Sequence, residues 1–182
     1  MGKKLSEMTL DELWQLFPII LEEHKTCWAD WFTEEKNILS GLLPHAEISH
    51  IGSTAIPGIW AKPTVDILME IDSDIDMHSV KQLLEDNGYS CMSGNGSRMS
   101  FNKGYTENGF AERVFHLHLR YEGDRDELYF RNYLIAHPDV AKEYEKLKLS
   151  LWKQYEHDRD GYTERKTDFV KKYTELAKES LF

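Results

Sequence analysis

The spacing of apolar residues along this chain changes from a helical period to a strand period and back again. Between residues 28 and 43, aromatic and aliphatic side chains recur at three- and four-residue intervals, which predicts an amphipathic helix. Between residues 64 and 71, the side chains alternate in a strand-like period of two. From residue 126 onwards the helical period returns. Strands in the middle and helices at both ends indicate an α+β fold, a mixed sheet flanked by helices.

The N-terminal segment has the signature of a capped helix. Thr9–Glu12 has the form of a capping box, and the amphipathic stretch Leu10–His24 follows it. Because Pro18 has no N–H group to donate, we expect it to kink or interrupt this helix. In the next helix, Trp28 and Trp31 are expected to act as packing anchors rather than ligand contacts.

The other elements follow from the same two periods and from turn residues. Further helices are expected at Ser79–Asn87, Asp126–Ala136, 139–156 and 162–179. Strands are expected at Glu47–Ile51, Thr64–Ile71, Arg98–Asn102 and Arg113–Tyr121, the last two forming a hairpin through residues 104–109. The chain has no internal repeat, low-complexity tract or linker, so we predict one domain over residues 1–182, in which residues 1–26 form a helical N-terminal extension.

Acidic residues outnumber basic ones and give the chain a formal net charge of −10. This charge repels phosphate backbones at long range and argues against a dedicated DNA or RNA binder, while a local basic pocket for a small phosphorylated ligand is compatible with it. Basic residues become frequent towards the C-terminus, where they alternate with acids, and we interpret them as a solvated helix surface. They are Lys146, Lys148, Lys153, Arg159, Arg165, Lys166, Lys171 and Lys172.

The cysteines and the lack of long apolar runs indicate the cellular compartment of the protein. Cys27 and Cys91 have no CxxC spacing, so we expect neither a disulfide framework nor a thiolate metal cluster. No run of about 18 apolar residues would span a membrane, and the first residues lack the apolar stretch of a secretory signal. We therefore expect a cytoplasmic protein that has no membrane partner. The oligomeric state stays open.

A glycine–serine turn at the end of a strand is the first candidate site. Gly52 and Ser53 follow the expected strand Glu47–Ile51, and such a turn offers free backbone N–H groups and a hydroxyl to a phosphate. Asp66, on the next strand, is placed to hold a divalent metal against that phosphate. The structural alternative is that Gly52 only permits a tight turn and that Ser53 caps a short helix.

Two histidines on one strand face are the second candidate site. His116 and His118 are two positions apart, so their Cα atoms are separated by roughly 6.5 Å and both imidazoles face the same side. With Asp66 they would form a two-histidine, one-carboxylate metal site for magnesium, manganese or zinc. These three residues are our candidate catalytic and metal-binding residues. The alternative is a pair of hydrogen-bonded histidines on a half-buried sheet face.

A lysine among aromatic residues is a third, fainter feature. Tyr162, Lys166 and Phe169 fall on one side of the last expected helix. A lysine in this position either reaches an anion or extends its charged end past apolar surface into water. The sequence favours the second alternative.

Several segments together resemble one protein family. The string His50-Ile-Gly-Ser-Thr-Ala-Ile-Pro-Gly-Ile-Trp-Ala-Lys-Pro-Thr-Val-Asp-Ile-Leu resembles the signature of the GrpB family. The other similar blocks are Trp28-x-x-Trp-Phe-x-x-Glu-Lys, Phe115-His-Leu-His-Leu, Phe130-Arg-Asn-Tyr-Leu-x-Ala-His-Pro and Tyr162-x-x-x-Lys-x-x-Phe-Val. The resemblance covers nearly everything from about residue 27 onwards. Lys62 and Lys166 lie within these blocks, so we take them, with Gly52 and Ser53, as candidate ligand-binding residues.

The resemblance implies a polymerase-beta-like nucleotidyltransferase fold, which by itself does not establish an activity. Active members of that superfamily place a Gly-Ser pair before a strand with two carboxylates two residues apart. Gly52, Ser53 and Asp66 fit this pattern, but Leu68 occupies the second carboxylate position. Glu70 does not replace it, because four strand residues put its Cα roughly 13 Å from that of Asp66.

A third carboxylate of the superfamily pattern lies on a later strand, where this chain has His116 and His118. Imidazoles are softer ligands than magnesium prefers. Two-metal phosphoryl transfer needs oxygen ligands clustered around two ions, so the sequence argues against its usual form.

Three functions are compatible with these residues. The leading hypothesis is a nucleotidyltransferase-like enzyme or nucleotide binder acting on a small molecule, with a nucleoside triphosphate as substrate. Gly52 and Ser53 would hold phosphate, Asp66 a metal, and His116 or His118 a metal or a proton. The second is a hydrolase that uses one transition metal at the same three polar residues. The third is a binding domain that kept the fold and lost the chemistry.

Overall fold

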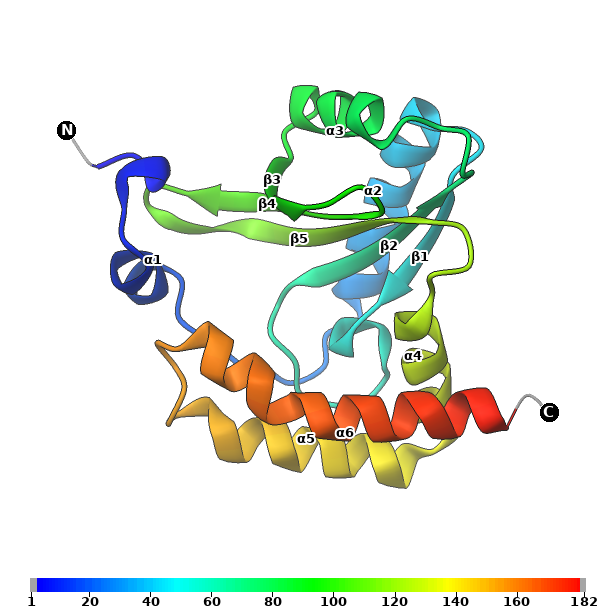
Figure 1. Ribbon diagram of the computed structural model, residues 1–182. Coiled ribbons are helices and arrows are strands. Elements are labelled where there is room, and N and C mark those ends of the chain that lie inside the picture. Colours follow the sequence, from blue (N-terminus) through cyan, green and yellow to red (C-terminus); the bar gives the residue numbers. More distant parts are fainter. Residues whose placement is uncertain (1–2, 181–182) are drawn as a thin grey trace.

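A five-stranded mixed sheet forms the centre of the computed structural model, which describes residues 3–180 (Figure 1). The strands are β1 (Glu47–Ile51), β2 (Val65–Ile71), β3 (Ser90–Gly94), β4 (Arg98–Thr106) and β5 (Gly109–Tyr121). Their order across the sheet is β1-β2-β5-β4-β3. The β2–β5 pair is parallel and the other pairs are antiparallel. The predicted α+β fold with a mixed sheet and flanking helices is confirmed.

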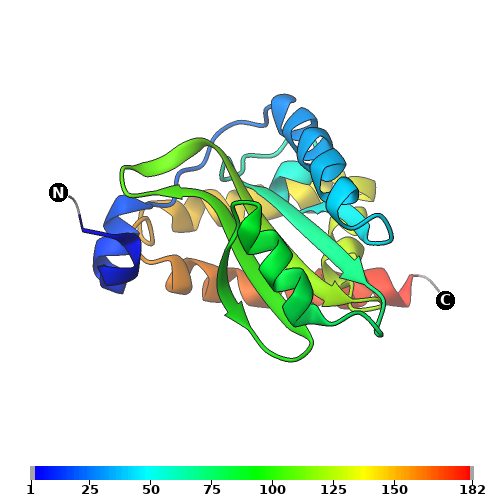
Figure 2. The same ribbon diagram turned by 90° about the horizontal axis from the view of Figure 1, so that it is seen from above.

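Helices lie on both sides of this sheet (Figure 1). They are α1 (Leu10–Leu16), α2 (Cys27–Leu42), α3 (Met77–Asp86), α4 (Asp126–Ala136), α5 (Pro138–Trp152) and α6 (Arg159–Glu179). Seen from above in Figure 2, α3 lies over the sheet, whereas α6 passes beneath it. None of the helices within residues 3–180 has the length and apolar character needed to cross a membrane.

The main hydrophobic core lies between the sheet and the α2–α3 side. Ile67 of β2 and Leu117 of β5 are fully buried there, in one cluster with Trp28 of α2 and Leu84 of α3. A second cluster, which includes Tyr144, joins α4, α5 and α6. The helices α5 and α6 therefore stand opposite the main core, and the polar face of the sheet is turned towards them.

The N-terminal segment differs from the long helix that the sequence predicts. The capping box at Thr9–Glu12 is confirmed, because each of these two side chains accepts a hydrogen bond from the other's backbone N–H. The helix ends at Leu16, ahead of Pro18, and the chain does not become helical again until Cys27. The predicted interruption at Pro18 is confirmed, but the prediction that the helix resumes as far as His24 was wrong.

Burial explains why this helix does not resume after the proline. Ile19 and Leu21 are each 2% exposed, whereas Ile20 between them is 39% exposed. This period of two belongs to an extended segment. The segment pairs with the loop before β2 through a single antiparallel bridge between Glu22 and Ala61. Tertiary contacts thus prevail over a helical pattern in the sequence.

The strand β3 is absent from the sequence-based prediction. Most of its residues are exposed, so it carries no alternation of apolar and polar side chains to detect. The predicted β4–β5 hairpin is confirmed, and both strands extend beyond their expected ends until Thr106 pairs with Gly109. The expected strands β1 and β2 and the helices from α2 to α6 are present with small shifts at their ends.

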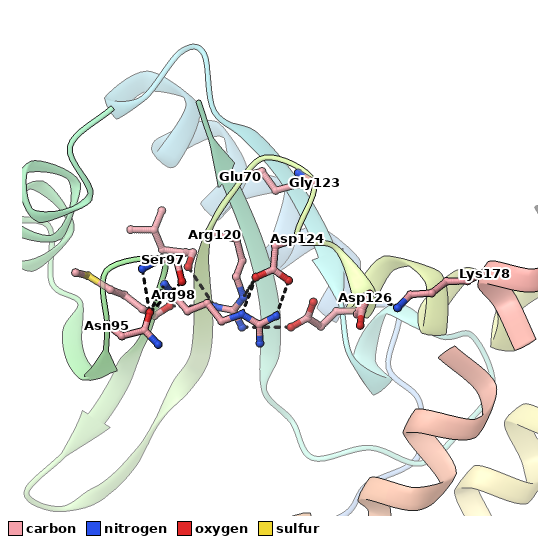
Figure 3. Close-up of polar contacts among 12 residues, drawn as sticks. Glu70, Asn95, Ser97, Arg98, Arg120, Gly123, Asp124, Asp126 and Lys178 are labelled. Carbon is pink, nitrogen blue, oxygen red and sulfur yellow. Dashed lines mark hydrogen bonds and ion pairs between the residues drawn. The ribbon is translucent and has the colours of Figure 1, made fainter. Parts of the chain in front are cut away.

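Charged side chains around the end of β5 form a paired network, shown in Figure 3. Arg98 donates two hydrogen bonds of 2.6 Å to the carboxylate of Asp124. The Arg120 side chain, only 7% exposed, lies 3.7 Å from Asp124 and 3.3 Å from Glu127. Both guanidinium groups converge on the same carboxylate, so each of these cations has an anionic partner.

Candidate functional site

Asp66, His116 and His118 lie together on the face of the sheet opposite the main core. The parallel register of β2 and β5 places Asp66 beside His116 and Leu68 beside His118. From Oδ1 of Asp66, Nδ1 of His116 is 3.5 Å away and Nε2 of His118 is 3.8 Å away. The predicted convergence of these three side chains is confirmed. The apolar residues expected on the other face are buried in the core, namely Val65, Ile67, Phe115 and Leu117.

Burial and mutual contacts determine the charge on these groups. Burial alone would raise the pKa of Asp66, but its contacts with His116 and His118 and their charges outweigh this effect. The pKa of Asp66 therefore lies well below the ordinary value of aspartate. Burial lowers the pKa of His116, although Asp66 opposes the shift. The site thus combines an ionised carboxylate with an imidazole that favours its neutral form.

A hydrogen-bonded chain leads from this site through Tyr105 to Arg159. The Tyr105 hydroxyl oxygen is 2.7 Å from Nε2 of His116, and Arg159 donates a 2.5 Å hydrogen bond to the same oxygen. Because a guanidinium group only donates, the Tyr105 hydroxyl can direct its own hydrogen at His116. His116 then accepts at Nε2 and carries its proton on Nδ1, on the side of Asp66. The chain therefore selects one tautomer of His116.

A β-bulge brings Tyr105 to this face of the sheet. Asn102 pairs with His116, so strict alternation would send Tyr105 to the opposite face. The register shifts between Lys103 and Tyr105, and Gly104 between them has φ +93°, where glycine is favoured. A side chain at Gly104 would also collide with the backbone of the neighbouring strand. The local chain geometry thus directs the tyrosine to the site.

The Gly52–Ser53 turn packs directly against Asp66. Gly52 has φ +71°, and a Cβ atom at this position would overlap the Asp66 carboxylate, so a glycine is needed for two reasons. The N–H groups of Gly52 and Ser53 donate to no backbone carbonyl within residues 3–180. Ser53 does not cap the 3₁₀ turn that it begins. Instead its hydroxyl accepts a 2.9 Å hydrogen bond from Lys148.

Four cations from distant segments gather near this turn. Lys62 lies in the loop before β2, Lys148 lies on α5, and Arg159 and Lys166 lie on α6. In the part of the chain that the structure describes, none of them has a carboxylate oxygen within 4.0 Å. Lys148 also donates to the Trp60 carbonyl, and the Lys166 ammonium lies 4.4 Å from the centre of the Tyr162 ring.

These lysines are held in surroundings that disfavour their charge. Burial and the nearby charges of Lys166 and Arg159 lower the pKa of Lys62 to about 7. Burial and the charge of Lys166 likewise lower the pKa of Lys148 to about 7. Burial lowers the pKa of Lys166 to about 8. Asp66 raises all three values without cancelling the shifts, so the site holds more positive charge than its carboxylate balances.

The second carboxylate of the superfamily pattern is missing from this face. Leu68 is fully buried beside His118. The Glu70 carboxylate is committed elsewhere, because it lies 3.0 Å from Arg125 and accepts a 3.2 Å hydrogen bond from the Gly123 N–H. Within residues 3–180, Asp66 is the one carboxylate that contacts the two histidines.

The donor set at Asp66, His116 and His118 suits one transition-metal ion better than a pair of magnesium ions. Across residues 3–180, no three His, Cys, Asp or Glu side chains are arranged so that they could hold a metal ion without moving. The nearby charges of Lys62 and Lys166, which both interact with Asp66, oppose the arrival of another cation. A metal at this site therefore stays a prediction.

Three residues of the site were not among the sequence-based candidates. Lys148 and Arg159 were interpreted, with Lys166, as part of a solvated helix surface, and that interpretation was wrong for all three. Lys148 is 2% exposed and the other two are partly buried. A signal existed for Lys148, which lies four residues after the buried Tyr144 on the inward side of α5. Nothing in the local sequence indicated Tyr105, because its orientation depends on the bulge.

Comparison with known proteins identifies the family. Residues 18–176 match the model of the GrpB protein family. This chain belongs to the GrpB family. The glutamate-rich protein GrpB of Alkalihalophilus pseudofirmus is 35% identical over 160 residues, which cover 84% of this chain and 91% of that protein. The UPF0157 protein YqkA of Bacillus subtilis is 34% identical over 185 residues, covering 96% of this chain and 52% of YqkA, so the chain spans about half the length of that relative.

Solved structures support both the family and the fold. The crystal structure of conserved protein GrpB from Enterococcus faecalis superimposes with a TM-score of 0.76 at 29% identity, covering 89% of this chain and 99% of that one. A Cid1 poly(U) polymerase mutant bound to MgATP gives a TM-score of 0.50 at 14% identity, covering 70% of this chain and 45% of Cid1. The second likeness shows the fold alone. This GrpB-family chain thus has a nucleotidyltransferase-like fold, as its motifs predicted.

Proposed function

We propose that this GrpB-family protein binds a phosphate-bearing small molecule, with a nucleotide as the leading ligand, on the polar face of its sheet. The supporting observation is a set of four cations that have no carboxylate partner among residues 3–180, namely Lys62, Lys148, Arg159 and Lys166. Removing an unpaired charge from water carries a large free-energy cost, so buried charges are normally paired. A phosphate chain would supply the missing negative charge.

The glycine–serine turn supports the same ligand. Its two free N–H groups and the Ser53 hydroxyl are donors of the kind that phosphate oxygens accept. The Lys148 ammonium, already 2.9 Å from this hydroxyl, would lie beside the same phosphate. Asp66 is ionised and would repel a phosphate in direct contact. In this proposal it orients His116 and His118, or bridges to the phosphate through a divalent ion that arrives with the nucleotide.

Transfer of a nucleotidyl group is a finer proposal that the fold makes reasonable and the site supports less well. The usual reaction relies on two metal ions held by several carboxylates. This face offers Asp66 alone, because Leu68 replaces one carboxylate and Glu70 is paired with Arg125. We therefore propose nucleotide binding first, and propose transfer only for a mechanism that needs a single ion.

A metal-dependent hydrolase is the second candidate function. It is favoured by the approach of Nδ1 of His116 and Nε2 of His118 to one oxygen of Asp66, at 3.5 and 3.8 Å. A bound transition metal would supply an activated water. To bind a metal through Nδ1, His116 would carry its proton on Nε2 and donate it to the Tyr105 hydroxyl oxygen, which would hold the ring in position. This candidate and the anion site use the same face and compete for Asp66.

Calorimetric titration with tripolyphosphate and with ATP, each with and without magnesium, tests the leading proposal. We expect binding that weakens at least tenfold in Lys62→Met, which removes one cation and keeps an apolar side chain of similar length. Lys153→Met is the matched control, because the Lys153 side chain is 71% exposed and pairs only with Glu156 on the surface. Binding should not change in the control. Absence of binding by either probe at millimolar concentration would overturn the proposal.

Metal content, measured by mass spectrometry after incubation with zinc, manganese or magnesium, tests the hydrolase candidate. We expect Asp66→Asn, His116→Ala and His118→Ala each to abolish retention, because the three ligands act as one unit. Retention should also fall below the ordinary histidine pKa near 6.5, since a ligand imidazole must be neutral. If the unsubstituted protein retains none of the three metals, the hydrolase candidate is withdrawn.

A further inference from the structure

A cavity adjoins the four cations on the side of the N-terminal segment. It encloses about 420 Å³, which falls within the range of small-molecule sites. Its apolar walls come from the segment after α1, from α2, from the loop before β2 and from β5. These walls include Ile19, Trp28, Trp31, Pro63, Phe110 and Val114. Lys62 and Arg159 also line this cavity, so its charged end is shared with the anion site.

We propose that this cavity, the Trp31 pocket, binds a flat aromatic group belonging to the same ligand whose phosphates contact Lys62 and Arg159. A nucleobase is the chemical group that combines these two features in one molecule. The inference rests on the proposed function, because the cations define where the charged part of the ligand lies. It adds the location and chemical class of the uncharged part.

The aromatic walls favour a flat ring over a sugar or another strongly polar group. Trp31 and Phe110 are partly exposed and can contact a ligand, whereas Trp28 is fully buried behind them. The guanidinium of Arg113 lies 5.5 Å from the centre of the Trp31 ring and helps to hold it in place. Stacking on such a ring stabilises any nucleobase, because every base has a flat aromatic face. A sugar would instead need many polar partners.

The charged side chains that line the pocket indicate where the anionic part of the ligand lies. Glu22 forms an ion pair with Lys25, so these two lining side chains largely neutralise each other. A further lining carboxylate, Glu112, lies on β5 and is exposed to water. Lys62 and Arg159 have no such partner in residues 3–180. An anionic group would therefore lie at the Lys62 end, and the ring attached to it would extend towards Trp31.

A second cavity provides an internal comparison. It encloses about 550 Å³ and is lined by Trp14, Phe17 and Tyr105, and it also touches Arg159. It does not include Lys62. The Trp31 pocket thus shares two of the unpaired cations, and the second cavity shares one. This difference assigns the aromatic group to the Trp31 pocket.

The test compares tripolyphosphate with ATP and UTP by calorimetric titration. We expect the unsubstituted protein to bind both nucleotides at least tenfold more tightly than tripolyphosphate. Trp31→Leu should remove most of that difference and change tripolyphosphate affinity less than twofold. Trp31→Phe, which keeps an aromatic face, should retain the difference. Trp14→Leu is the matched control, since Trp14 is also partly buried and lines the other cavity.

The outcomes separate this inference from the proposal on which it rests. Equal affinity for tripolyphosphate and the nucleotides would overturn the Trp31 pocket and leave the anion site standing. Loss of discrimination in Trp14→Leu rather than Trp31→Leu would also overturn it. Failure of all three probes to bind would overturn the proposed function and this inference together. Circular dichroism and the melting temperature of each variant show whether it is folded.

Discussion

Two groups of charged side chains lie in different parts of the molecule and are built in opposite ways. At the end of β5, Arg98 and Arg120 converge on Asp124 (Figure 3). Glu127 lies 3.3 Å from Arg120 as well. Near Asp66, four cations have no carboxylate within 4.0 Å among residues 3–180. The first group resembles a structural network in which each arginine has a carboxylate partner. The second resembles a binding site in which the ligand supplies the negative charge.

The difference has an energetic consequence. Removing one member of a paired buried network leaves its partner without compensation, and the fold loses stability. Neutralising one member of an unpaired cluster removes repulsion and desolvation, so the fold gains stability while the ligand loses a contact. The two groups should therefore respond to charge removal with opposite signs.

The largest effect is expected at Arg120. Arg120→Met leaves Glu127 without its cation at a position where the arginine is 7% exposed. We expect a loss of about 3 kcal/mol in the free energy of unfolding, measured by urea denaturation. Arg98→Met is the control, because its side chain is 53% exposed and should contribute about 1 kcal/mol or less. Equal losses in the two variants would mean that burial does not distinguish these pairs.

Gly52→Ala should produce the next largest effect. The added methyl group meets the Asp66 carboxylate, and φ +71° strains any residue with a Cβ atom. We expect a loss of about 2 kcal/mol, together with weaker binding of tripolyphosphate. Gly58→Ala is a close control, since Gly58 has φ +75° but open space around its Cα. If both variants lose the same stability, the contact with Asp66 contributes nothing.

Lys62→Met should shift stability in the other direction. The Lys62 side chain has neither an ion pair nor a hydrogen bond within residues 3–180, so little is lost with its charge. We expect a gain of about 1 kcal/mol and a rise of about 2–4 °C in melting temperature. A fall in melting temperature would contradict the description of this cluster as unsatisfied.

The pH dependence gives a second measure of the same cluster. The pKa of Lys62 is about 7 in the folded protein, below its ordinary value of 10.5. Between these values the unfolded chain binds the proton more tightly, so its destabilising effect is complete below pH 7 and is relieved as pH rises. We expect the melting temperature to increase between pH 7 and 9, and to increase less in Lys62→Met. Tripolyphosphate affinity should fall over the same range.

Tyr105→Phe should give the smallest change in stability, about 1 kcal/mol or less, with a specific spectroscopic effect. Without the hydroxyl, His116 loses the donor that favours a proton on Nδ1. We expect nitrogen NMR shifts of His116 to show more of the Nε2–H tautomer. Tyr155→Phe, whose hydroxyl accepts from Arg165 away from His116, is the control. Unchanged shifts in Tyr105→Phe would remove the tyrosine from any role in positioning His116.

The sequence predicted the part of the site that depends on local alternation. Asp66, His116 and His118 could be placed on one polar face because side chains alternate along each strand. The parallel pairing that sets them side by side is not readable from either strand alone. Lys148 had one local signal, its four-residue spacing from Tyr144 on α5. Arg159 begins a helix whose charged residues include both signs, so local spacing gave no reason to separate it from surface residues. Tyr105 needed the unseen register shift at Gly104.

The parallel β2–β5 pairing also bears on the order in which the protein folds. The β4–β5 hairpin joins residues that are close in the chain, whereas β2 must find a strand about fifty positions away, as the Asp66–His116 partnership shows. Closing so long a loop is slow compared with forming a hairpin. In a refolding experiment, the capacity to bind an anion should therefore return after the hairpin has formed. Ligand binding would report the completion of the native topology.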